Sequence, residues 1–136
     1  EYFKRRQNLL EKVAERFERI HMFFFDVTIQ YGCYVSGYVK GLSPVQNDRD
    51  KYFEYLNKIE DDLRELHVLE GRLLLAGIKD GTKCLREYRL LATDVNDMIK
   101  LEEPEISKGA VQEVSEKLCT KKDSFYDVIS KSYKNI

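Results

Sequence analysis

Two acid–histidine pairs are the residues of this chain whose types and spacing come closest to metal chemistry. Glu18 and His21 are three residues apart, so on a helix they share one face. Di-iron centres in helical bundles take a Glu-x-x-His pair from each of two helices and a glutamate from each of the others. His67 and Glu70 form the second pair in reversed order, and Arg64 stands where the glutamate belongs. The di-iron pattern is therefore at most half met.

These four residues, Glu18, His21, His67 and Glu70, are the candidate ligand- or metal-binding set. The simpler interpretation is two histidines at the core boundary and two acids that are paired or reach solvent. We adopt the simpler interpretation, so we expect no metal and no cofactor.

Glu70 also interrupts a seam of apolar residues. The seam recurs at spacings of three and four and comprises Tyr52, Leu56, Ile59, Leu63, Leu66 and Leu73. An unpaired charge in such a seam is costly, so we expect a basic or tyrosine partner for Glu70. A metal ligand or a pH-sensitive group is the alternative.

Nucleophilic catalysis finds little support in the three cysteines, Cys33, Cys84 and Cys119. They form no CxxC pair and fall on predicted helices, where a cysteine is more often a small apolar residue than a nucleophile. The sequence also contains no Gly-rich phosphate loop and no GxSxG or HExxH motif. We therefore expect a protein that is not an enzyme. An odd number of scattered cysteines favours a reducing compartment, so we expect the cytoplasm or the cytosolic side of a membrane.

Tyrosines are frequent in this chain, which has nine of them and no tryptophan. A cluster is expected on the inward side of the first helix, where Tyr52, Tyr55 and Tyr88 could approach Tyr31, Tyr34 and Tyr38. Buried tyrosine hydroxyls need partners, so the cluster could line a pocket for a small ligand. The alternative, which we favour, is that these side chains fill one end of the fold with their hydroxyls in water.

Apolar periodicity predicts helices that position these residues along nearly the whole chain. The helices are expected at about residues 2–41, 48–77, 82–101 and 104–134. A heptad seam marks the first of them and comprises Phe3, Leu10, Phe17, Phe24, Tyr31 and Tyr38. The sequence KDGT at 79–82 indicates a turn, because Asp-Gly tolerates positive φ. A break is expected in the last helix near 120–123.

Four amphipathic helices with short connections predict an all-α fold, an antiparallel up-down-up-down four-helix bundle with a long first helix. We expect residues 1–136 to form a single domain. The chain has the general look of a bacterial helical-bundle domain, and that look implies no activity.

A second apolar stripe runs along the first helix, about 120° from the seam, and comprises Met22, Phe25, Ile29 and Cys33. A membrane span is excluded for residues 19–38 because Arg19, His21, Asp26 and Gln30 interrupt the run. Neighbouring helices cover the stripe, or it is an interface with another chain or a second copy, or it lines a ligand cavity. Asp26 would then lie on the rim of that interface or pair across it.

The charges of the chain nearly balance, with a formal net charge of -1 and a pI near 6.2. Such a balance does not favour nucleic acid, so we expect a protein partner or a homodimer. Lys4, Arg5 and Arg6 would suit the cytosolic flank of a membrane helix, and a membrane is expected only if an anchor precedes residue 1. The resulting hypothesis is an interaction or sensory module. A ligand- or metal-binding bundle and the soluble domain of a membrane-anchored protein are the alternatives.

Overall fold

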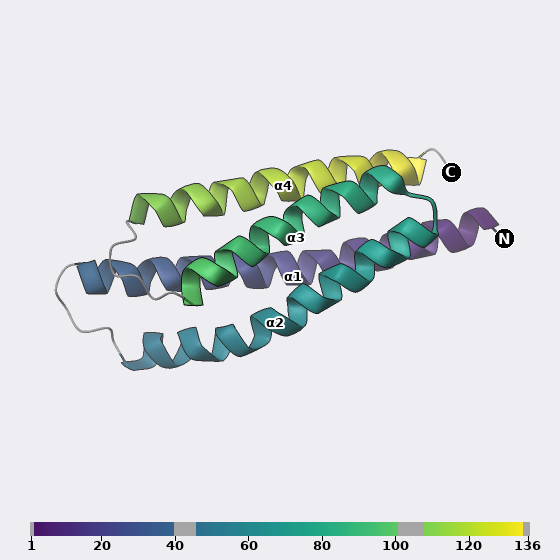
Figure 1. Ribbon diagram of the computed structural model, residues 1–136. Helices are drawn as coiled ribbons and strands as arrows, with labels where there is room; N and C mark the ends of the chain where they lie inside the picture. The colour runs from purple at the N-terminus through teal and green to yellow at the C-terminus, as the bar shows by residue number, and fades with distance from the viewer. Residues whose placement is uncertain (1, 40–45, 101–107, 135–136) are drawn as a thin grey trace.

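Four helices run side by side along one long axis (Figure 1). The computed structural model describes residues 2–39, 46–100 and 108–134. For some of these residues it describes the backbone but not the side chain, namely 33–39, 46–49, 51–53, 55, 99, 100 and 108. The helices are α1 (Tyr2–Val39), α2 (Gln46–Leu75), α3 (Lys79–Lys100) and α4 (Lys108–Lys134). Each helix packs mainly against its two neighbours, and α1 meets α3 only weakly across the diagonal. The prediction of an antiparallel four-helix bundle is confirmed.

The core lies along the axis of the bundle and follows the predicted seam of α1. Phe17 of α1 is fully buried at its centre, with ring centroids 4.8 Å from Tyr88 of α3 and 4.5 Å from Phe125 of α4. The seam of α1 is buried from Leu10 to Tyr31, whereas Phe3 is exposed because α1 begins beyond the ends of α2 and α4 (Figure 1). The fully buried side chains of α2 include Ile59, Leu66, Leu69 and Leu73. In α2, Leu56 and Leu63 of the predicted seam are only partly buried, and Leu69, outside that seam, is fully buried.

The turn between α2 and α3 lies three residues earlier than predicted. α2 ends at Leu75, and Gly77 adopts a positive φ of 76°. The Ile78 N–H donates to the Leu73 carbonyl at 2.9 Å and the Gly77 N–H donates to the Leu74 carbonyl at 3.0 Å, which is the hydrogen-bond pattern of a Schellman cap. Ile78 is buried beside the end of α2. Residues 79–82, predicted as the turn, form instead the first turn of α3.

α1 begins at Tyr2 and α4 ends at Lys134, as predicted, whereas the other bounds that the structure describes differ from the prediction by at most three residues. α2 begins at Gln46 rather than 48, and α3 begins at Lys79 rather than 82. α4 continues through Thr120 and Asp123 without the predicted break. The predicted end of the first helix at 41 and the predicted start of the fourth at 104 lie outside the described residues.

Candidate functional site

The outward face of α1 carries an exposed apolar stripe. Met22 is 61% exposed and Ile29 is 46% exposed, while Phe25 is half-buried. Because α1 packs against α2 and α4, none of the described helices covers the side of α1 opposite the core. Asp26 is half-buried on this same face. Cys33, the last residue of the predicted stripe, has a side chain outside the described part of the chain.

His21 is buried rather than placed at the core boundary as predicted. Its Nδ1 lies 2.8 Å from the Tyr88 hydroxyl of α3. Burial lowers the pKa of His21 to about 4, with a further decrease from Lys122 and an opposing contribution from Asp123. Burial raises the pKa of Tyr88 far above its ordinary value, so the tyrosine keeps its proton and the imidazole stays neutral.

Glu70 is 3% exposed and forms ion pairs with two arginines of α3. Nε of Arg89 donates to one carboxylate oxygen, and its second nitrogen lies 3.3 Å from the other. Nε of Arg86 donates to that second oxygen at 3.3 Å. Glu70 thus has two basic partners where one was expected. Arg89 contacts the carboxylate through two nitrogens, and Arg86 contacts it through one.

The four candidate metal ligands do not form one site. Glu18 and His67 are both exposed, whereas His21 contacts Tyr88 of α3 and Glu70 pairs with two arginines of α3. Among the side chains that the structure describes, no group of three or more from His, Cys, Asp or Glu is placed to hold a metal ion. The geometry therefore gives the metal hypothesis no support.

The predicted tyrosine cluster is only partly visible. Tyr31 and Tyr88 are fully buried, while Tyr34, Tyr38, Tyr52 and Tyr55 have side chains outside the described residues. Cys84 and Cys119 are half-buried free thiols, and burial raises the pKa of Cys84. A raised pKa disfavours the thiolate, which agrees with a packing role for Cys84.

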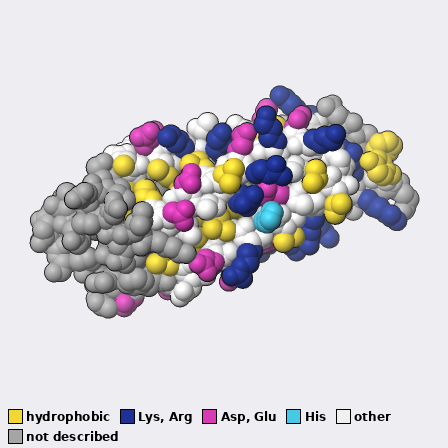
Figure 2. All heavy atoms as spheres, viewed as in Figure 1, with side chains coloured by type: hydrophobic (Ala, Val, Ile, Leu, Met, Phe, Trp, Pro, Cys, Tyr) yellow, Lys and Arg dark blue, Asp and Glu magenta, His cyan; other side chains and the backbone are white. Residues whose placement is uncertain are grey.

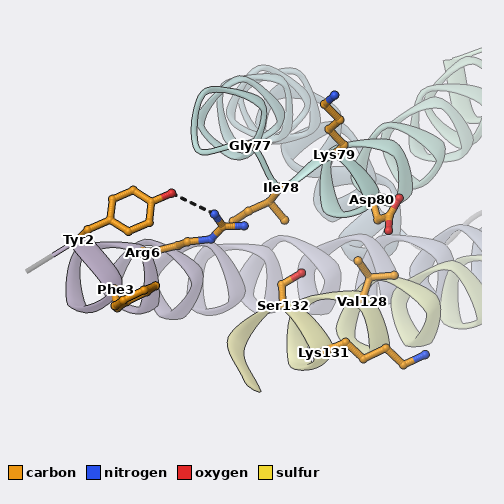
Figure 3. A pocket seen from close by; sticks show the side chains of 10 residues that line it. All are labelled: Tyr2, Phe3, Arg6, Gly77, Ile78, Lys79, Asp80, Val128, Lys131 and Ser132. Carbon is orange, nitrogen blue, oxygen red and sulfur yellow. Dashed lines mark hydrogen bonds between the residues drawn. The ribbon is translucent and has the colours of Figure 1, made fainter. Parts of the chain in front are cut away.

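A cavity of about 700 Å³, which was not predicted from the sequence, opens at the end of the bundle where α1 and α3 begin. It lies between the start of α1, the α2–α3 turn and the end of α4 (Figure 3). Its lining residues are Tyr2, Phe3, Arg6, Gly77, Ile78, Lys79, Asp80, Val128, Lys131 and Ser132. In the sequence, the basic run at 4–6 is the one feature that could have pointed to this cavity, since the other cations around it are scattered along the chain.

Comparison with family models, with curated proteins and with solved structures finds no match to the chain. Among the described helices, none combines the length and the apolar character that crossing a bilayer requires. The features that bear on function are therefore the surfaces of the bundle itself.

Proposed function

We propose that the chain is a non-catalytic interaction module that self-associates through the outward face of α1. The observation that carries the proposal is the exposure of Met22 and Ile29, at 61% and 46%, along one line of a helix. Contiguous apolar residues on a helix face lose contact with water when a second helix covers them, a gain of about 25 cal/mol per Å² of apolar area.

Charge placement favours a second copy of this chain as the occupant. Arg19 and Asp26 lie on either side of Met22 on α1, and Arg19 is exposed. If two copies pair antiparallel about a twofold axis near Met22, Arg19 of each copy faces Asp26 of the other. A twofold interface repeats every contact, so one such pairing supplies two ion pairs around a central contact between the two Met22 side chains.

The size of the face predicts a weak dimer. Stable complexes bury about 1,600 Å² in total, and one helix face with two exposed apolar side chains offers less. We therefore expect a monomer–dimer equilibrium that depends on concentration rather than a permanent dimer.

Light scattering on a sizing column, over a roughly hundredfold range of protein concentration, tests the proposal. The mass should rise toward that of a dimer, and Met22→Glu should abolish the rise because it buries a charge in the interface. Val68→Glu alters an exposed apolar residue of α2 and is the matched control, which should still dimerise. A strict monomer at every concentration would refute self-association, and a dimer that survives Met22→Glu would refute this surface.

Charge reversal tests the antiparallel arrangement separately. Arg19→Glu or Asp26→Arg alone should weaken the dimer, because each places like charges opposite one another. The double variant restores opposite charges and should recover dimerisation. If the double variant is as weak as the single ones, the two residues do not face each other.

A further inference from the structure

We propose that the end of the bundle where α1 and α3 begin docks on the surface of an anionic lipid membrane. This end, called here the basic end, comprises residues 2–10, 72–83 and 127–134, which are three segments far apart in the sequence. They meet because α1 and α3 begin where α2 and α4 end (Figure 1). The proposal goes beyond self-association through α1 and does not depend on it.

Charge is strongly polarised toward the basic end. Its cations are Lys4, Arg5, Arg6, Arg72, Lys79, Lys83, Lys131 and Lys134, and its acids are Asp80 and Asp127. Eight cations and two acids give a net charge of +6, so the remainder of a chain whose total is -1 carries -7. The chain is therefore nearly neutral in total although the basic end is strongly positive and the rest of the chain is negative.

Helix stability does not explain most of these cations. Lysine and arginine are favourable near the C-terminus of a helix, where they oppose the negative end of the dipole, and unfavourable near the N-terminus. Arg72, Lys131 and Lys134 stand in last turns. The other five cations of the basic end lie within the first two turns of α1 or α3. Their concentration at that end indicates an anionic partner.

The cavity of the basic end offers donors to such a partner. Arg6, Lys79 and Lys131 line it against a single acid, Asp80. Nε of Arg6 is buried and has no hydrogen-bond partner among the described residues, while another nitrogen of the same guanidinium contacts the Tyr2 hydroxyl at 3.2 Å (Figure 3). A buried N–H without a partner is rare in folded proteins, but this Nε is shielded from solvent, so the donors that a lipid phosphate could reach are the exposed side chains of Lys79 and Lys131.

Exposed apolar side chains at the same end favour a membrane over a soluble polyanion. Leu75 is 91% exposed, and Tyr2, Phe3 and Leu74 are also exposed. Figure 2 shows hydrophobic side chains beside Lys and Arg at the tip of the molecule where α1 begins. Duplex DNA would use the cations and leave the leucines in water, whereas a bilayer interface takes tyrosine, phenylalanine and leucine together with Lys and Arg.

Vesicle co-sedimentation at low and high salt tests the proposal directly. The chain should bind vesicles of phosphatidylcholine with phosphatidylserine and should not bind phosphatidylcholine alone, and salt should weaken binding because the attraction is electrostatic. No binding to anionic vesicles at low salt would overturn the proposal.

Two lysines of α4 provide a matched pair of variants. Lys131 pairs with Asp127 at 3.0 Å and Lys117 pairs with Glu113 at 3.3 Å, both with i,i+4 spacing on an exposed face. Lys131→Glu should lower vesicle binding by about tenfold, whereas Lys117→Glu, outside the basic end, should change it by less than about twofold. Equal effects of the two variants would overturn the proposal. Lys134→Glu replaces Lys131→Glu if the latter fails to fold.

Leu75→Ser separates a membrane from a soluble polyanion. It should lower vesicle binding several-fold by removing an apolar contact and should leave binding to heparin unchanged. If duplex DNA binds as tightly as anionic vesicles and Leu75→Ser affects neither, the partner is a nucleic acid and the membrane assignment is wrong.

Discussion

Nδ1 of His21 lies 2.8 Å from the hydroxyl of Tyr88, and this contact joins two buried side chains on helices that face each other across the diagonal of the bundle. Phe17 packs against both rings, with centroids 6.2 Å from His21 and 4.8 Å from Tyr88. Because Tyr88 retains its proton, its hydroxyl can donate to Nδ1 when the imidazole carries its own proton on Nε2. The contact thus satisfies two polar groups in an otherwise apolar layer.

Stability should depend on pH through His21. Burial lowers its pKa from 6.5 to about 4, so between these values the unfolded chain binds a proton that the folded chain does not. The free energy of unfolding should therefore be fully retained above pH 6.5 and fall as pH decreases toward 4, by about 3 kcal/mol at most. Urea unfolding of the protein at about pH 7 and about pH 4.5 measures the difference.

His21→Gln should remove this part of the pH dependence, whatever its effect on stability at neutral pH. His67→Gln changes the exposed histidine, the other of the two in the chain, and is the control. Identical pH profiles for the protein and His21→Gln would contradict the assignment of a neutral, buried imidazole.

The four helices could be predicted because their apolar residues recur with helical period, as Leu10, Phe17, Phe24 and Tyr31 do at intervals of seven in α1. The turn before α3 was placed wrongly because Asp80–Gly81 has the composition of a turn. In the structure Asp80 lies in the first turn of α3, where an acid is favourable. Gly77 supplies the positive φ instead, and a glycine near a helix end carries that signal weakly in the sequence.

The sites were harder to predict because they depend on which residues from different helices come together. Periodicity placed Met22 and Ile29 on one line of α1, and it identified Glu70 as an acid within a seam. It did not identify Arg89 as the partner of Glu70 or Tyr88 as the partner of His21, since these contacts span 19 and 67 residues. The basic end escaped detection for the same reason.

Glu70 should be held mainly by Arg89 rather than by Arg86. Both arginines pair with the carboxylate, but Arg89 is 22% exposed and makes the bidentate contact, whereas Arg86 is 55% exposed. Solvent screens the exposed pair more strongly. Arg89→Met should therefore lower the free energy of unfolding by about 2–4 kcal/mol and Arg86→Met by less than about 1 kcal/mol.

Urea titration of the two methionine variants gives this comparison, and each retains most of the apolar stem of the arginine. Glu70→Gln changes the acid that both arginines share, because it removes the negative charge and keeps much of the hydrogen bonding. It should cost more than Arg86→Met. Equal losses of unfolding free energy in the two arginine variants would show that the more buried ion pair is not the stronger one.

Two glycines of α2 and its cap should respond oppositely to alanine. Gly77 has a φ of 76°, which strains a residue with a Cβ atom, whereas Gly71 lies inside α2 and an added Cβ there meets nothing within 4 Å. Gly77→Ala should lower the free energy of unfolding by about 1–2 kcal/mol. Gly71→Ala should raise it by up to about 1 kcal/mol, because alanine favours the helix interior. Thermal unfolding followed by circular dichroism distinguishes the two, and a stabilising Gly77→Ala would contradict the Schellman cap that ends α2.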